Sequence, residues 1–168
     1  MLITPRELEI HRIVISKAYA PGELNYRGAE FRQGIPLQVN AVAELVAKEI
    51  HIRGRLETQL EAVCDRCLGP AEICVDRNFD LFYRPMSAIA REEEVKIPRD
   101  ELEVGFYSGE GVELVEVLTE QVILSVPMKI ICRPDCQGLC PSCGANRNSE
   151  DCHCSTPTVN PPFISLEE

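Results

Sequence analysis

Hydrophobic and polar residues alternate along two long segments in the first half of the chain. The first runs from Ile50 to Cys64 and the second from Ile73 to Tyr83. Strict alternation is typical of a β-strand with one buried face, and the turn CDRCLGP between the segments predicts an antiparallel hairpin. This hairpin would carry two thiols, Cys64 and Cys67, at its tip. Gly54 interrupts the apolar face of the first strand and indicates a bulge or a bend.

Two further segments are strand candidates on the same grounds. They are Leu8 to Ile15 and Leu37 to Val46, although Ala41 and Ala43 in the latter also suit a helix. From Ser87 to Ser108 the alternation gives way to charged residues, a proline and a glycine. We expect a loop or linker there.

A helix is predicted from Glu113 to Ser125, where apolar residues recur every three or four positions. Glu113 and Glu116 lie in its first turn, where the helix dipole favours acids, and Pro127 ends it. Such a stripe is far more often a core face than a partner site, so we expect the helix to pack on the sheet. The predicted fold is α+β, a mainly antiparallel β-sheet with one packed helix and a C-terminal zinc-knuckle segment.

The length of 168 residues suits one domain with a small metal-stapled segment. We expect an antiparallel sheet domain over residues 1–128, a cysteine-rich zinc-binding segment over 129–155, and an extended tail over 156–168. The first residues lack the basic start and long apolar run of a secretory signal. No segment approaches the roughly 18 apolar residues of a membrane span. We therefore expect a cytoplasmic protein with reduced thiols.

The formal net charge is −10, and most of it lies in one segment. Residues 92–120 hold ten acids against two bases, which gives −8 of the total. A chain this acidic is poorly suited to non-specific binding of phosphates, so a basic protein is the electrostatically easier partner. The acidity can equally serve solubility alone.

Eight of the nine cysteines form four closely spaced pairs. The pairs are Cys64 with Cys67, Cys132 with Cys136, Cys140 with Cys143, and Cys152 with Cys154. Structural zinc takes four cysteine or histidine ligands, commonly as two close pairs, so the sequence predicts two sites of four cysteines each. Cys74 is left over and is expected to be an ordinary thiol.

Four pairs can join in three ways, and loop length favours one of them. Only eight residues separate Cys143 from Cys152, so the two C-terminal pairs can close a local site at small entropic cost. The other two pairs would then meet and tie the C-terminal segment to the hairpin tip. The sequence CPSCG supports a tight knuckle, because Gly144 tolerates a positive φ. The cysteine pattern leaves open whether the chain binds one zinc ion or two, and whether the ligands hold zinc or an iron–sulfur cluster.

Three sequence elements resemble the bacterial YceD family, the large ribosomal RNA subunit accumulation proteins. They are CDRCL at 64–68, SVPM at 125–128 after the predicted helix, and CRPDCQGLCPSCGANRN at 132–148. The resemblance implies a cytoplasmic role in 23S ribosomal RNA accumulation during large-subunit assembly. Some members of the family lack the GLCPSCG cluster but keep the first thiol pair, which fits two separable sites. Arg147 stands where the family usually has an aliphatic residue. The tail is more acidic than the usual basic ending, which weakens the case for a tail–RNA contact.

The function expected from the resemblance is that of a non-enzymatic ribosome-assembly factor. Its partner would be large-subunit ribosomal RNA or its precursor, a basic ribosomal protein, or both. The candidate RNA contacts are individually weak, and they are Arg53, Arg55, Arg66, Lys129, Arg133 and Arg147. An acidic adaptor that binds a basic ribosomal protein without touching RNA is an alternative.

The cysteines also bear on two other functions. A redox-sensitive zinc chaperone is an alternative, because peroxide can open thiolate sites and release the metal. Catalytic zinc keeps an open position and usually has histidine or carboxylate ligands, whereas this chain offers closed sets of four thiols. We therefore expect no catalytic residues, no enzyme activity and no small-molecule substrate.

Overall fold

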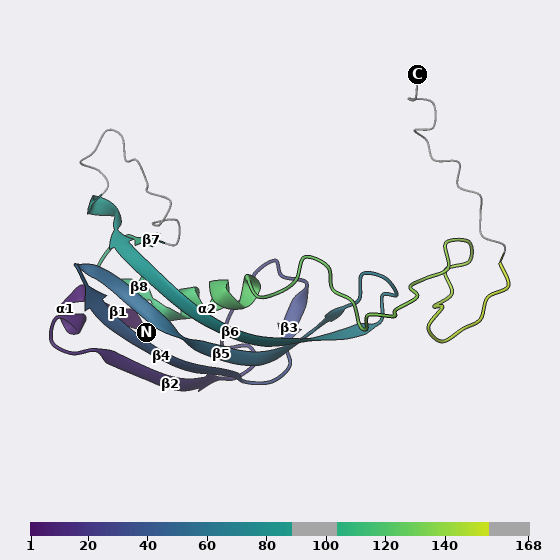
Figure 1. Cartoon of the computed structure of the whole chain (residues 1–168), viewed down its shortest axis with the longest axis horizontal. Helices are drawn as coiled ribbons and strands as arrows, with labels where there is room; N and C mark the ends of the chain where they lie inside the picture. The colour runs from purple at the N-terminus through teal and green to yellow at the C-terminus, as the bar shows by residue number, and fades with distance from the viewer. Residues whose placement is uncertain (89–103, 155–168) are drawn as a thin grey trace, which may run out of the picture. The chain divides into compact units, whose positions relative to one another are not determined.

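Figure 1 shows the chain as a computed structural model, which describes residues 1–88 and 104–154. The described residues form two units with separate internal contacts. The first unit comprises residues 1–62 and 72–128. The second comprises residues 63–71 together with the segment that begins at Lys129. The predicted acidic segment lies partly, and the predicted extended tail entirely, outside the described residues.

The first unit is built on a β-sheet with the strand order β2-β4-β5-β6-β7, and β3 also pairs with β5. A separate two-stranded sheet joins β1 and β8. The strands are β1 (Leu2–Ile3), β2 (Ile13–Tyr19), β3 (Phe31–Gln33), β4 (Leu37–Val46), β5 (Glu49–Val63), β6 (Pro70–Pro85), β7 (Val104–Tyr107) and β8 (Val112–Glu113). The helices are α1 (Pro5–Leu8) and α2 (Leu114–Ile123), with a 3₁₀ turn at Met86–Ala88. The α+β class predicted from the sequence is confirmed, although the described residues contain two α-helices where one was expected.

The long hairpin predicted from the alternating pattern is formed by β5 and β6. Its strands run antiparallel, since Gln59 bonds to Glu72 near the turn and Arg55 bonds to Asp76 farther along. On its other side β5 pairs antiparallel with β4, and Gly54 lies opposite Ala41. A Cβ at Gly54 would lie 2.5 Å from the Cβ of Ala41. The glycine that interrupts the apolar pattern therefore permits a close approach of the two strands.

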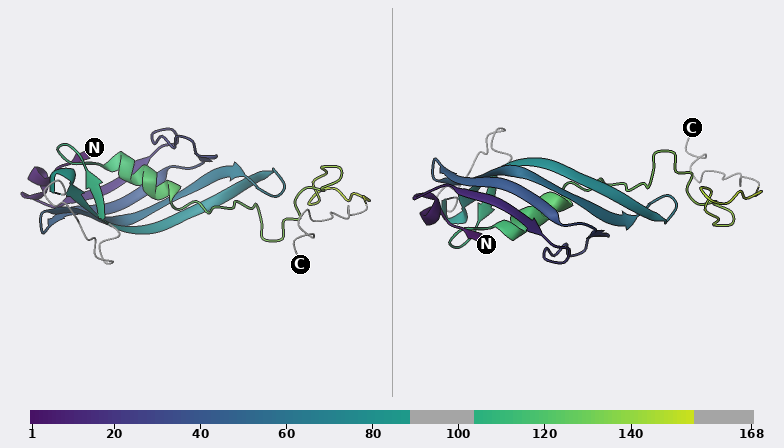
Figure 2. Two further views of the ribbon diagram at one scale, coloured as in Figure 1. Left: turned by 90° about the horizontal axis from the view of Figure 1, so that it is seen from above. Right: turned by 90° about the horizontal axis from the view of Figure 1, so that it is seen from below.

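One face of the sheet is covered by α2, which lies across the strands in Figure 2. The helix buries Leu114, Val117, Leu118, Gln121 and Val122. The four apolar side chains among these join the apolar face of β4 and β5 in one core. The core members that are wholly inaccessible to solvent include Ile3, Leu37, Ala43, Ile50, Ile52, Leu56 and Leu60. The helix predicted over Glu113 to Ser125 is present, and its packing on the sheet is confirmed.

Arg77 is a charged residue on the face of β6 that α2 covers, and a hydrogen bond to the end of α2 accommodates it there. Its guanidinium Nη1 donates a 3.0 Å hydrogen bond to the carbonyl of Leu124, directly after the last turn of α2. The carbonyls at the end of a helix lack partners within the helix and carry its partial negative charge. Arg77 therefore caps α2 and fixes the helix end to the sheet.

Two sequence predictions are corrected by the structure. The strand predicted from Leu8 to Ile15 begins only at Ile13, because Leu8 belongs to the short helix α1. Thr4 caps this helix and accepts a hydrogen bond from Glu7 N. The loop predicted from Ser87 to Ser108 contains β7, which pairs parallel with the end of β6. A strand of four residues is too short for its alternation to be recognised among charged neighbours. No helix of the described chain has the length and apolar character needed to cross a membrane.

Candidate metal centre

The turn between β5 and β6 is shaped by local hydrogen bonds around its two cysteines. Cys64 N donates to the carbonyl of Gly69 at 2.8 Å, and Leu68 N donates to the carbonyl of Cys64 at 2.9 Å. Leu68 has a φ of 55°, in the left-handed region that tight turns use. The result is a compact knuckle that brings Cys64 and Cys67 to one side.

The knuckle is bound to the C-terminal segment within the second unit. Asp65 N donates to the carbonyl of Ile130 at 2.8 Å, and Ile130 N donates back to the Asp65 carboxylate at 2.6 Å. Leu139 N donates to the carbonyl of Arg66 at 3.1 Å, where Gly138 with a φ of 73° lies against the same carbonyl. These contacts place the second thiol pair of the sequence beside the first.

The first cysteine set consists of Cys64, Cys67, Cys132 and Cys136. Their four sulfurs all lie within 4.8 Å of one another. The Sγ–Sγ distance is 3.9 Å between Cys64 and Cys136, and 3.7 Å between Cys67 and Cys132. A tetrahedron with metal–sulfur bonds of about 2.3 Å has edges of about 3.8 Å. The sulfurs are therefore spaced as four ligands of one tetrahedral ion, and none of the nine cysteines forms a disulfide.

The second cysteine set consists of Cys140, Cys143, Cys152 and Cys154, whose sulfurs also lie within 4.8 Å of one another. Gly144 N donates to the carbonyl of Cys140 at 2.9 Å, and Gly144 has a φ of 75°. The positive φ expected at this glycine is confirmed. Both sets are the ones that the loop-length argument favours.

Backbone N–H groups point at sulfurs of both sets, and their effect is strongest at Cys64 and Cys140. Burial opposes ionisation of the Cys64 thiol, but N–H donors of Cys67, Cys132 and Arg66 outweigh it and lower its pKa to about 6. The N–H groups of Cys143 and Ser142 lower the pKa of Cys140, likewise to about 6. Each set thus holds at least one sulfur whose hydrogen bonds favour the thiolate at neutral pH.

The pKa of two neighbouring sulfurs, Cys132 and Cys154, shifts in the opposite direction. Burial, followed by hydrogen bonds with the other sulfurs of its set, raises the pKa of Cys132 to about 12. The hydrogen bond with Cys143 and its negative charge raise the pKa of Cys154 to about 12. Four thiolates within one set repel one another unless a cation lies between them, and a bound divalent ion deprotonates coordinating thiols. The donor chemistry of both sets therefore fits a soft divalent metal.

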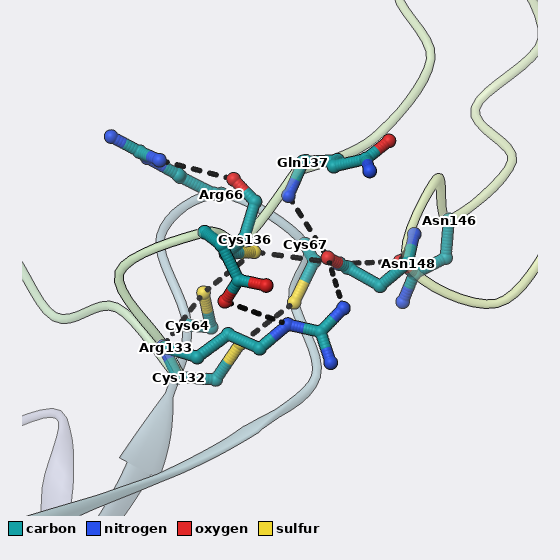
Figure 3. Close-up of polar contacts among 10 residues, drawn as sticks. Cys64, Arg66, Cys67, Cys132, Arg133, Cys136, Gln137, Asn146 and Asn148 are labelled. Carbon is teal, nitrogen blue, oxygen red and sulfur yellow. Dashed lines mark hydrogen bonds and ion pairs between the residues drawn. The ribbon is translucent and has the colours of Figure 1, made fainter.

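A polar residue that the sequence analysis did not single out adjoins the first cysteine set. Figure 3 shows the side chain of Asn148 pointing at the sulfur of Cys136, with an Nδ2–Sγ distance of 3.4 Å. Asn146 supports it through a 2.8 Å hydrogen bond between the two side-chain amides. The only signal in the sequence was the pair of asparagines that follows the CPSCG knuckle.

Both arginine candidates for RNA contact in the first unit are engaged by acids. Arg55 makes two 2.7 Å hydrogen bonds to the carboxylate of Asp76 and lies 2.9 Å from that of Glu57. Arg53 lies 3.4 Å from Glu44. An RNA phosphate at this face would have to compete with these carboxylates, so the sheet face is a weaker RNA-binding candidate than the sequence suggested.

The other four candidates belong to the second unit and differ among themselves. Arg66 Nη1 donates to the carbonyl of Cys136 at 3.0 Å, which gives it a structural role in the first cysteine set. Arg133 is shared between Asp135, at 3.4 Å, and Asn148, at 3.0 Å. Lys129 and Arg147 are exposed. Cys74 is exposed on β6 and belongs to neither cysteine set, as expected for an ordinary thiol.

Comparison with known proteins gives a consistent family assignment. The family model described as large ribosomal RNA subunit accumulation protein YceD matches residues 52–168. An uncharacterised protein of Mycobacterium tuberculosis (strain ATCC 25618 / H37Rv) is 31% identical over 161 residues, which cover 95% of this chain and 72% of the relative. A chloroplastic YCED homolog 1 of Arabidopsis thaliana is 24% identical, over 74% of this chain and 46% of the relative. No solved structure matches.

Proposed function

Because the chain belongs to the YceD family of large ribosomal RNA subunit accumulation proteins, we propose that it is a cytoplasmic, non-enzymatic factor that supports 23S ribosomal RNA accumulation and large-subunit assembly. The observation that carries the proposal is the family match over residues 52–168. That range contains the β5–β6 turn and both cysteine sets. The family is described by ribosomal RNA accumulation, which supports a role in large-subunit assembly.

We further propose that each cysteine set holds one Zn²⁺ ion. Four sulfurs at tetrahedral spacing, with backbone N–H donors on Cys64 and Cys140, support this assignment. A bound metal would cross-link the cysteines of the second unit, whose own apolar cluster is small. A closed set of four thiolates leaves no position for a substrate, which supports a structural rather than a catalytic role. Metal analysis by mass spectrometry under native conditions would count the ions and separate zinc from iron.

Complementation in a host that lacks the gene tests the function. We expect the deletion strain to show a reduced ratio of 23S to 16S ribosomal RNA, and the wild-type chain to restore it. A Cys64→Ser/Cys67→Ser variant should fail to restore the ratio. Cys74→Ser is the matched control, because Cys74 is exposed and outside both sets, and it should restore the ratio fully. An unchanged ratio in the deletion strain would refute the proposed function.

The ion-paired arginines favour a second candidate, an acidic adaptor that binds a basic ribosomal protein without contact to RNA. Arg53 and Arg55 are occupied by carboxylates, and the chain carries a net charge of −10. Pull-down from lysate with and without RNase separates the two. RNA-independent capture of a basic ribosomal protein would support the adaptor, whereas capture that RNase abolishes would support direct RNA binding.

A further inference from the structure

Asn148 lies in the loop between two cysteines of the second set, yet its side chain contacts the first set. Its Nδ2 donates to Cys136 Sγ at 3.4 Å. Its Oδ1 accepts hydrogen bonds from Gln137 N at 2.9 Å and from Arg133 Nη2 at 3.0 Å (Figure 3). Backbone N–H and guanidinium groups can only donate, so the amide oxygen must face them and the amide nitrogen must face the sulfur.

The orientation of Asn148 is fixed by Asn146. The Oδ1 atom of Asn146 accepts from Asn148 N at 3.0 Å and from Asn148 Nδ2 at 2.8 Å. Asn148 Nδ2 therefore uses one proton for the sulfur and one for its neighbour. A side chain with its full hydrogen-bonding capacity engaged in this way holds one rotamer, which suits a residue that positions a metal ligand.

The loop that carries Asn148 is tied at both ends to the second cysteine set. It runs from Gly144 to Asp151, directly between Cys143 and Cys152. Along the loop, Cys140 N donates to the carbonyl of Ala145 at 2.8 Å. Arg147 N donates to the carbonyl of Gly138 at 3.0 Å. A metal held by the second set would fix both loop ends, because both flanking cysteines would be its ligands.

We propose that Asn148 is a positioning residue that couples the two cysteine sets. Metal in the second set orders the loop, the loop holds Asn148 on Cys136, and the hydrogen bond to this sulfur retards loss of metal from the first set. The inference rests on the proposed metal sites. Removal of an outer-shell partner of a metal ligand typically costs 10- to 100-fold in metal affinity. Coupling of this kind is reciprocal, so metal in the first set also favours metal in the second.

The test measures how fast the full-length chain, loaded with Zn²⁺, loses the metal to a chelator. Alkylation of the freed thiols, read by mass spectrometry, reports separately when each cysteine set opens. Asn148→Ala should open the first set about tenfold faster than the wild type. Asn148→Asp keeps the acceptor Oδ1 but replaces the donor nitrogen with an anionic oxygen that faces the sulfur, so it should open the first set at least as fast. Arg147→Ala is the control, because the Arg147 side chain is exposed and its hydrogen bond to Gly138 comes from the backbone N–H, which alanine keeps.

A second variant tests whether the coupling passes through Asn148. Cys140→Ser/Cys143→Ser abolishes the second site, so native mass spectrometry should count one Zn²⁺ per chain. That ion should leave the first set about tenfold faster than in the wild type. Addition of Asn148→Ala to this variant should then cause no further acceleration, because the loop no longer holds Asn148 in place.

Three results would overturn the coupling. The first is that the first set opens at the same rate in Asn148→Ala as in the Arg147→Ala control. The second is a first set that opens at the wild-type rate when the second site is abolished. The third is a wild-type chain that binds no metal, which would also refute the metal sites. Loss of 23S ribosomal RNA support in cells is a separate readout, so a failure of the proposed function would not be mistaken for a failure of the coupling.

Discussion

Arg55 and Asp76 form a bidentate pair across the β5–β6 hairpin, on the face of the sheet that carries polar residues. The guanidinium donates two hydrogen bonds of 2.7 Å to the carboxylate. The hydrogen bond from Arg55 lowers the pKa of Asp76, desolvation opposes this to a smaller extent, and the charge of Arg55 lowers the pKa further. Exposed pairs of this kind contribute little stability at neutral pH, but their dependence on pH has a definite sign.

We expect Asp76→Asn to lose a pH-dependent part of the folding stability. Because the pKa of Asp76 is lower in the folded than in the unfolded chain, its contribution is present above the unfolded value of about 4 and disappears as the pH falls through the folded value. Urea unfolding of both proteins between about pH 7 and pH 3 should show the wild type slightly more stable at neutral pH and the difference vanishing in acid. In an Arg55→Gln background, Asp76→Asn should produce no such trend. A difference that stays constant down to the lowest pH would contradict the prediction.

At the scale of elements, regular patterns were predictable from the sequence and short elements were not. Alternation over more than ten residues predicted β5 and β6, and helical spacing predicted α2. By contrast, β7 has four residues and α1 has four, which is no more than two periods of either pattern. Both are held by contacts distant in sequence or by a cap, as with the parallel pairing of β7 with β6. The presence of β7 is decided by tertiary packing, which the local sequence does not encode, whereas α1 depends on the local cap at Thr4.

The candidate metal centre was predictable in its ligands but not in its surroundings. Cysteine spacing gives the four pairs, and loop length favours one way of joining them into two sets, because both are properties of the chain itself. The hydrogen bonds from Asn148 to Cys136 and from Arg66 to the carbonyl of Cys136 depend on how the β5–β6 turn meets the C-terminal segment. The spacing of asparagine and arginine alone carries no signal of this kind.

The packing of α2 on the sheet gives a direct prediction for a pair of leucines. Leu118 is 0% exposed in the core, whereas Leu124, just beyond the helix end, is 57% exposed. Leu118→Ala should lower the free energy of unfolding by roughly 2–5 kcal/mol, because it removes buried methyl groups and leaves a cavity. Leu124→Ala should change it by less than about 0.5 kcal/mol. Chemical denaturation monitored by circular dichroism measures both, and equal effects would mean that the helix does not form part of the core.

At the scale of the whole molecule, the two units differ in what stabilises them. The first unit has one extended apolar core that draws on the sheet and α2. The second unit has a small cluster of Cys64, Cys67, Ala71 and Cys136, with Ile130 and Ile131 packed against it. Three of the four buried members of that cluster are candidate metal ligands. A segment with so few apolar side chains cannot offset the conformational entropy of its own folding, so metal binding would have to supply the difference.

Metal removal should therefore unfold the second unit and leave the first unit folded. Hydrogen–deuterium exchange on the full chain, before and after treatment with a strong chelator under reducing conditions, measures this by segment. Peptides from residues 129–154 and from the β5–β6 turn should lose nearly all protection. Peptides from β4 and α2 should keep theirs, because the side chains of the first core include none of the eight clustered cysteines. Re-addition of Zn²⁺ should restore the protection of the second unit. If β4 and α2 also lost protection, the sheet would depend on the metal, and the cysteine sets would be stabilising the whole chain rather than its C-terminal segment.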